Sequence, residues 1–391
     1  MELPKTAVQA GIYSTAKLIA KGISFLALLY FARRLGASHF GVYTYLLSIV
    51  FLIQPFSTLG MLSEVSRRSK SRTLMFFQNF LSTFSCLNFV SALVVSLIVV
   101  LRGYSLYLAA TCFVAFIFLN TYDFLSKAHM VAGRVRYVSI TAILERTLFS
   151  IMVLTFPKKT LFLFAAMIIS YFVSGIYLWT NLKPKLHFKF EFPNIQFFSW
   201  EFFSALLFLA VASRLPPIIY DWRFGVATLG NFGVAAYVFQ GVSLLVTELG
   251  TFLTLRAGRF KDRQFKTIKK LTILGAVLIT GLVLILTPLI SAVGTWVFGT
   301  GFTTAGGLLA IMAFGVASSL LFFYPRSKLM YSSPKKYGIA YLVYMIFAVF
   351  FALVAKDIFQ ATALGVVARY IHVGVSWIFA DTTKISSRVE T

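Results

Sequence analysis

Long apolar stretches alternate with short polar segments along almost the whole chain. Runs of about 20 apolar residues recur, and roughly 20 such residues in a helix cross the ~30 Å hydrocarbon core of a bilayer. Within the runs, apolar and polar positions do not alternate, which argues against a transmembrane β-barrel. The pattern predicts twelve helices, near residues 10–32, 40–62, 77–101, 104–125, 137–156, 160–182, 197–220, 226–252, 271–293, 302–324, 337–355 and 358–380.

Composition agrees with a membrane protein. The chain of 391 residues is 59% hydrophobic and 12% charged, whereas about 25% of the residues of a soluble domain are charged. We therefore expect an all-α integral membrane protein that crosses the bilayer many times.

Basic residues predict the orientation of the chain. Lysine and arginine concentrate in alternate connections, most densely between residues 256 and 270, and cytoplasmic loops carry such an excess. Both termini are expected in the cytoplasm, and the location is the cytoplasmic (inner) membrane. The net charge of +24 then reflects loops beside anionic lipid headgroups rather than nucleic-acid binding. Lys17 and Lys21 interrupt the first apolar run, so no cleaved signal peptide is expected.

One short motif occurs twice. "HFGVYTYLLSIV" (39–50) and "NFGVAAYVFQGV" (231–242) share Phe-Gly-Val followed by two residues and a tyrosine. The copies open the second and the eighth predicted helix, so both halves enter the membrane in the same direction. Parallel repeats of this kind occur in transporters. The motif predicts two six-helix bundles, residues 1–190 and 191–391.

Signatures of catalysis are missing from the sequence. Cys86 and Cys112 fall within predicted helices without metal-ligand spacing, the four histidines are scattered, and neither a Walker loop nor a GxSxG elbow occurs. We expect no enzyme, no metal and no bound cofactor.

The stretch "FARRLGASHFGVYTYLLSIVFLIQPFSTLGMLSEVSRR" (31–68) resembles the start of Wzx-type polysaccharide flippases. These belong to the multidrug/oligosaccharidyl-lipid/polysaccharide (MOP) exporter superfamily. The segments 218–237 and 288–315 resemble later turns of the same family. The residues that carry the motif and its second copy are Gly36, Phe40, Gly41, Gly233 and Tyr237.

The resemblance implies a function. Such a flippase moves an oligosaccharide on undecaprenyl diphosphate, the repeat unit of an O-antigen, capsule or exopolysaccharide, to the outer leaflet by alternating access. We also expect a monomer, with a proton or sodium gradient as an optional energy source, as in an antiporter. The sequence leaves open whether the protein acts alone or beside a polysaccharide polymerase.

Basic residues within helices are the candidates for gripping the diphosphate, because intramembrane charges mark functional paths. Lys17 and Lys21 form a polar stripe on the first helix with Ser14 and Ser24, although both lysines could instead snorkel to the interface. The deeper candidates are Arg146, Arg214 and Arg369.

Two of the deeper candidates have alternatives. Arg146 follows Glu145, so a structural ion pair competes with substrate binding. Arg214 precedes Pro216 and Pro217, which predict a broken helix with free carbonyl groups. Asp221 lies on the same helical face or pairs with Arg223. The ion-coupling candidates are Glu145, Asp221 and Glu248.

Other classes of protein remain open. A MATE-like, cation-coupled multidrug exporter shares the twelve-helix plan, but its cavity is expected to be acidic. A lipid II flippase is expected to carry two further helices. A structural membrane protein would leave the repeat and the intramembrane charges without a purpose.

Overall fold

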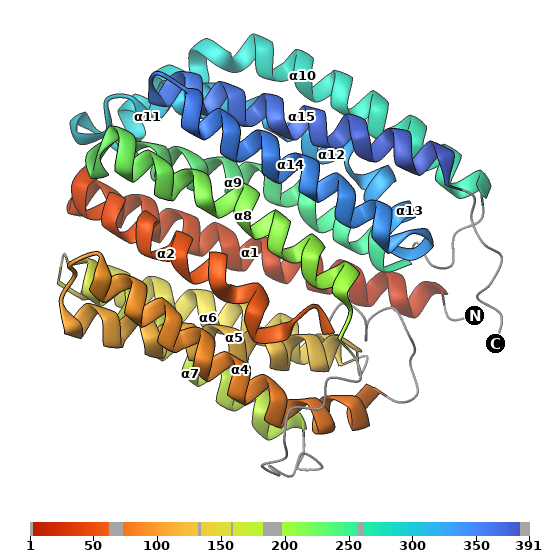
Figure 1. The fold of residues 1–391 in the computed structure, drawn as a ribbon, viewed down its shortest axis with the longest axis horizontal. Coiled ribbons are helices and arrows are strands. Elements are labelled where there is room, and N and C mark those ends of the chain that lie inside the picture. The colour runs from red at the N-terminus through yellow and green to blue at the C-terminus, as the bar shows by residue number, and fades with distance from the viewer. Residues whose placement is uncertain are drawn as a thin grey trace. The chain divides into compact units, whose positions relative to one another are not determined.

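Helices account for the regular elements in the part of the chain that the structure describes. The computed structural model describes residues 3–61, 73–131, 134–157, 159–182, 198–256 and 262–383, and the regular elements among them are helical (Figure 1). Several predicted basic loops, among them 67–72, 183–189 and 257–261, lie outside the described residues. Contacts divide the chain into two compact units, which are described separately below.

The first unit comprises Met1–Leu35 and Leu46–Phe203. In this unit α1 packs along α6, and α5 lies against α4 and α7. The helices that form it, with α2 shared between the units, are α1 (Leu3–Leu35), α2 (Ala37–Thr58), α4 (Thr73–Leu101), α5 (Leu106–Val131), α6 (Val135–Thr155) and α7 (Thr160–Leu182).

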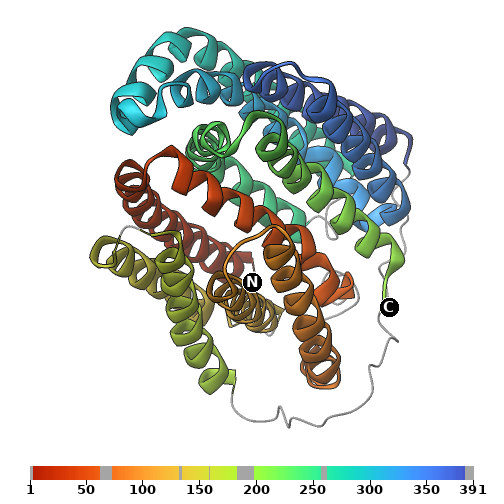
Figure 2. The same ribbon diagram turned by 60° about the vertical axis from the view of Figure 1, so that its left-hand side comes forward.

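The second unit comprises Gly36–Tyr45 and Ser204–Thr391. Figures 1 and 2 both show α14 and α15 side by side in this unit. Its elements are the first part of α2, α8 (Trp200–Phe224), α9 (Val226–Arg256), α10 (Asp262–Phe298), η2 (Thr300–Phe302), α11 (Ala305–Ala313), α12 (Gly315–Leu321), α13 (Phe323–Ser332), α14 (Pro334–Val354) and α15 (Ile358–Thr382).

The helices are long and apolar enough for a multi-pass membrane protein. Nine helices in the described part of the chain meet the length and hydropathy of a membrane span, or up to ten if the bent pair Ala305–Leu321 and Phe323–Met330 forms one span. On α10, Ile285 is 77% exposed and Leu278 64% exposed, as expected where lipid covers the surface. Twelve spans remain a prediction, and so does the orientation.

Aromatic contacts fill the interior of the first unit. The rings of Phe84 on α4 and Phe124 on α5 stack with centroids 4.4 Å apart. One turn after Phe124, the imidazole of His129 reaches the carbonyl oxygen of Leu178 on α7, with Nε2 2.9 Å from that oxygen. The three helices are thereby joined by stacking and by a polar contact that satisfies a buried ring nitrogen.

An aromatic cluster also fills the second unit. His372 on α15 is buried, and its ring centroid lies 4.6 Å from that of Phe322, 4.7 Å from that of Tyr341 and 5.0 Å from that of Tyr344. The cluster joins α15 to α14 and to the junction between α12 and α13.

A single glycine joins two long helices in each predicted half of the chain. Gly36 joins α1 to α2 with φ 78°, and Gly225 joins α8 to α9 with φ 83°. Both values lie in the left-handed region, which glycine adopts without a steric penalty. The two helix pairs therefore reverse direction by the same device.

The orientation can be tested at the two ends of α14. Lys335 and Lys356 are exposed and flank this span, and the distribution of basic residues predicts the first inside and the second outside. In a chain whose native cysteines are replaced by alanine, we expect a membrane-impermeant maleimide to label Lys356→Cys on intact cells and to spare Lys335→Cys until the cells are lysed. The reverse pattern would contradict the predicted orientation.

Candidate functional site

A buried ion pair lies within the first unit. The carboxylate of Glu145 is buried, and its Oε2 lies 2.8 Å from Nε of Arg146 on the same helix, α6. The hydroxyl of Tyr171 on α7 also hydrogen-bonds this carboxylate. The structural pair that the sequence left open is therefore present, and it neutralises a charge that would be costly to bury alone. The Arg146 side chain remains 31% exposed.

The lysine stripe of α1 is only partly described. Lys21 is exposed, whereas Ser24, one turn later, is buried. The side chains of Ser14 and Lys17 lie outside the described residues. The role of Lys17 and Lys21 in diphosphate binding therefore remains a prediction.

Arg369 lies near the middle of α15, in the interior of a membrane span. Its guanidinium carbon lies 4.9 Å from the ring centroid of Phe239 on α9, and Gly315 on α12 is near its Nη1. Within the described residues no carboxylate contacts Arg369. The cation is thus held against an aromatic face and the backbone of a small residue, an arrangement that leaves its donors available to an anion.

The prolines of α8 do not break that helix. α8 runs without interruption from Trp200 to Phe224 with Pro216 and Pro217 inside it, so the predicted break is wrong. Both prolines are buried, and membrane helices tolerate proline where neighbouring groups satisfy the freed carbonyl oxygens.

The charged residues of α8 lie along this continuous helix. Arg214 is half-buried and Asp221 buried. Arg223 donates from Nη1 to the carbonyl oxygens of Ala352, at 3.0 Å, and Leu353, at 2.6 Å. Arg223 is therefore engaged by the end of α14.

The repeated motif lies at the starts of α2 and α9. Phe40, Gly41 and Gly233 are buried and Tyr237 is half-buried. Glu248 belongs to α9, but its side chain lies outside the described residues. Its role in ion coupling remains a prediction.

The broken span is the tenth predicted helix. It consists of α11, α12 and α13, and it bends by 43° between Ala305–Leu321 and Phe323–Met330. Pro325 lacks the N–H that would bond the carbonyl oxygen four residues earlier, at Leu321. That oxygen accepts a hydrogen bond from Nε1 of Trp377 at 2.8 Å instead. α15 thus satisfies the acceptor that the proline frees.

A second donor on α15 acts at the earlier break. The hydroxyl of Tyr370 donates to the carbonyl oxygen of Phe314 at 2.8 Å, where α11 ends and α12 begins. Tyr370 and Trp377 lie two helical turns apart, as do their acceptors Phe314 and Leu321. The spacing of the two donors on α15 therefore equals the spacing of the two carbonyl oxygens at the breaks.

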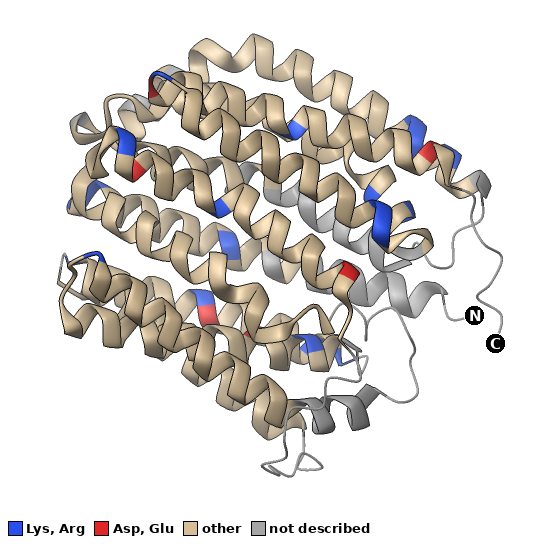
Figure 3. Cartoon of the chain, in the orientation of Figure 1, with Lys and Arg blue, Asp and Glu red and all other residues tan. Residues whose placement is uncertain are grey.

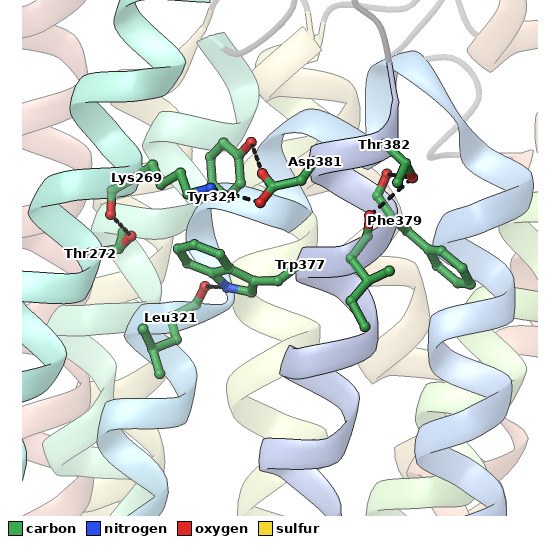
Figure 4. A network of polar contacts seen from close by, with 9 residues as sticks. Lys269, Thr272, Leu321, Tyr324, Trp377, Phe379, Asp381 and Thr382 are labelled. Carbon is green, nitrogen blue, oxygen red and sulfur yellow. Dashed lines mark hydrogen bonds and ion pairs between the residues drawn. The ribbon is translucent and has the colours of Figure 1, made fainter.

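Figure 4 shows a polar network at the far end of the same helices. Nζ of Lys269 on α10 lies 2.7 Å from Oδ2 of Asp381 on α15, and the hydroxyl of Tyr324 on α13 donates to Oδ1 of Asp381 at 2.8 Å. The same ammonium lies 5.1 Å from the ring centroid of Trp377. One carboxylate thereby ties three helices together.

Sequence reasoning missed Tyr370, Trp377 and the Lys269–Asp381 network. Two signals were present: Pro325 directly after a predicted span, and two hydrogen-bonding aromatic residues seven positions apart on the last helix. Figure 3 shows that charged residues are sparse within the described helices.

Comparison with solved structures shows the fold. The helical arrangement is similar to that of lipid II flippase MurJ in an inward closed conformation, which aligns with TM-score 0.75 at 13% identity, covering 95% of this chain and 87% of that one. The eukaryotic MATE transporter AtDTX14 aligns with TM-score 0.63 at 13% identity, over 98% and 97% of the two chains.

A third structure shares the fold. A MOP-superfamily transporter from Pyrococcus furiosus, described as having a binding pocket of reversed polarity, aligns with TM-score 0.63 at 12% identity, over 95% and 94% of the two chains. Identities this low establish the fold alone. No curated protein sequence matches the chain.

The sequence itself establishes the family. Residues 8–255 match the family described as "Polysaccharide biosynthesis protein". The chain belongs to this family.

The bond from Trp377 to Leu321 can be tested by one substitution. Trp377→Phe keeps an aromatic ring but removes the donor, and we expect the free energy of unfolding to fall by about 0.5–2 kcal/mol. Unfolding of the purified protein in detergent measures this change. Trp179→Phe, at an exposed position of α7, is the control, and equal stability of the two variants would limit Trp377 to a packing role.

Proposed function

We propose that the protein is a flippase for an oligosaccharide linked to polyprenyl diphosphate. It transfers this lipid from the cytoplasmic to the outer leaflet of the cell membrane by alternating access. Membership of the polysaccharide biosynthesis family supports the substrate class, and the fold shared with a lipid II flippase supports the mode of action.

The chemistry of the substrate explains why a protein is needed. Burying one hydroxyl without a hydrogen-bond partner costs roughly 2–7 kcal/mol, and an oligosaccharide carries many hydroxyls besides the charged diphosphate. A carrier must supply polar partners and positive charge within the membrane, while the polyprenyl tail stays in lipid.

Arg369 is the observation that carries the proposal. A cation in the middle of a membrane span is expensive unless it serves a function, and no carboxylate contacts Arg369 in the described part of the chain. An arginine guanidinium presents donors that suit two phosphate oxygens at once. We assign Arg369 to the diphosphate, with Arg214, Lys17 and Lys21 as further cationic contacts.

Arg146 and the acidic candidates take a secondary place in the proposal. Nε of Arg146 is occupied by Glu145, so Arg146 offers the substrate only its remaining donors. Glu145, Asp221 and Glu248 are the proposed sites for a coupling proton or sodium ion. An inside-negative potential also assists export of an anion by about 2.3 kcal/mol per charge per 100 mV, so a transported ion is optional.

A MATE-like multidrug exporter is the second candidate. The fold shared with AtDTX14 favours it, and so does the buried carboxylate of Glu145, which could face a cationic drug if Arg146 moved away. The charge balance weighs against it, because Arg369 would repel such a substrate.

Transport in proteoliposomes tests the proposal. We expect the purified protein to flip a fluorescent polyprenyl-diphosphate oligosaccharide, and Arg369→Ala to lower the rate about tenfold or more, because a charge-assisted hydrogen bond is worth about 1.5–3 kcal/mol. Arg369→Lys keeps the charge and should retain part of the activity. Arg102→Ala, which removes an exposed arginine at the end of α4, should leave the rate unchanged.

Two outcomes would contradict the proposal. Flipping at the full rate by a folded Arg369→Ala variant would remove this residue from the site. Absence of flipping, together with extrusion of a cationic dye that Arg369→Ala accelerates, would identify a drug exporter.

A further inference from the structure

Two lysines share one carboxylate where α10 begins and α15 ends. Nζ of Lys269 donates to Oδ2 of Asp381 at 2.7 Å, and Lys328 on α13 lies close enough to attract the same carboxylate electrostatically. The ring centroid of Tyr324 lies 5.5 Å from Nζ of Lys269 and 6.0 Å from Nζ of Lys328. Figure 4 shows Lys269, Tyr324 and Asp381 meeting from three helices. We call these four residues the lysine cluster, and its two cations exceed its one anion.

Lys269 can bind a further anion without releasing Asp381. An ammonium group carries three N–H donors, and the bond to Asp381 uses one of them. The side chain of Lys269 is 34% exposed, so an anion can approach it from outside the protein. The ring centroid of Trp377 lies 5.1 Å from the same ammonium, and this contact helps to hold the side chain in place.

The outer face of α10 carries lysines followed by apolar side chains. Phe265 and Ile268 are buried and define the inner face of the helix. Positions four apart lie on one side of a helix. Along the outer face, the exposed residues at this spacing are Lys266, Lys270, Leu274 and Leu278. A charged end that continues into an apolar stripe complements a phospholipid, which has a charged headgroup and apolar tails.

α10 is long enough to place these lysines at the membrane surface. Its 37 residues extend about 55 Å at 1.5 Å per residue, whereas the hydrocarbon core is about 30 Å thick. The distribution of basic residues predicts that this end of α10 faces the cytoplasm. Anionic lipids of the cytoplasmic leaflet give that surface a negative potential, and basic pockets between membrane helices bind their headgroups.

We propose that the lysine cluster and the outer face of α10 bind an anionic phospholipid of the cytoplasmic leaflet. Its phosphate accepts hydrogen bonds from Lys269 and Lys270, and Lys328 adds positive charge. Its acyl chains lie along Leu274 and Leu278. Asp381 positions Lys269 for this contact. A zwitterionic phospholipid has no net charge to balance the excess cation, so the site selects its lipid by charge. This inference does not depend on the substrate proposed above.

Quenching of tryptophan fluorescence by brominated lipids measures this selectivity. Trp377 is the reporter in a chain whose other, exposed tryptophans are replaced by phenylalanine, namely Trp179, Trp200, Trp222 and Trp296. In proteoliposomes, we expect brominated phosphatidylglycerol to bind beside Trp377 about tenfold more strongly than brominated phosphatidylcholine. The reason is that each lysine near a membrane surface raises the affinity for anionic lipid about fivefold.

Substitutions distinguish a specific site from general attraction to the membrane surface. Lys270→Gln combined with Lys328→Gln should lower the preference to about twofold or less, and Lys270→Arg should keep it. Arg136→Gln removes an exposed charge at the start of α6, on the same predicted side of the membrane, and is the matched control. It should leave the preference unchanged, and a loss equal to that of the double variant would overturn the site.

A chain that keeps every lysine provides a test that does not depend on folding of the double variant. Here Trp296 is the single tryptophan, exposed near the other end of α10, and Trp377 is replaced by phenylalanine. We expect quenching of Trp296 by the two brominated lipids to differ by less than twofold. The same preference at Trp296 as at Trp377, or no preference at either, would overturn the site.

The transported lipid also carries phosphate, so competition distinguishes the two sources. Inorganic diphosphate and a polyprenyl-diphosphate oligosaccharide are added separately, each at the concentration of the brominated phosphatidylglycerol. We expect neither to relieve the quenching of Trp377. Relief by the polyprenyl lipid would make the lysine cluster a docking point for that lipid and would overturn the assignment to a phospholipid. Relief by free diphosphate would overturn the role of the acyl chains along α10.

Discussion

A backbone carbonyl within the hydrocarbon core needs a hydrogen-bond donor from the protein, because lipid supplies none. Pro325 removes the donor that would serve Leu321, and Trp377 takes its place. The hydroxyl of Tyr370 donates to the carbonyl oxygen of Phe314, where α11 ends and α12 begins. α15 thus supplies a hydrogen-bond donor at each break of the tenth span, and at Leu321 this donor replaces one that the proline removes.

The absence of polar partners in lipid also affects how the charged side chains are placed. Glu145 is buried with Arg146 as its partner, and Asp381 is held by Lys269 and Tyr324 at the end of a span. Arg369 differs, because an aromatic ring and a glycine surround it in place of a carboxylate. A cation within a membrane span is costly unless it serves a function, and this agrees with the proposal that Arg369 binds an anion.

Sequence patterns predicted the helices well where one apolar run equals one helix. The run at 160–182 matches α7 exactly in its bounds, and the run at 358–380 matches α15 to within two residues. The adjacent pair Glu145–Arg146 could also be anticipated, because neighbours in sequence are neighbours in space. The contact of Arg369 with Phe239 could not, since it depends on how α9 and α15 pack.

The effect of proline was the main error in the sequence reasoning. Pro216 and Pro217 were expected to break α8, yet the helix continues through them, while the span that bends precedes Pro325. A proline frees a carbonyl oxygen in either case. Whether the helix then bends depends on which neighbouring donor reaches that oxygen, and this is a tertiary property that no local pattern contains.

The glycine turns at Gly36 and Gly225 are equivalent positions, from which the residues of the two halves of the chain can be aligned. When the two halves are aligned on these turns, Gly41 corresponds to Gly230. When they are aligned on the repeated Phe-Gly-Val motif, Gly41 corresponds to Gly233. Three residues of an α-helix amount to a shift of about 4.5 Å and a rotation of about 300°. The two alignments therefore pair positions about one turn apart on the same side of the helix, and only the alignment counted from the turns pairs the two glycines that lie against backbone, Gly41 and Gly230.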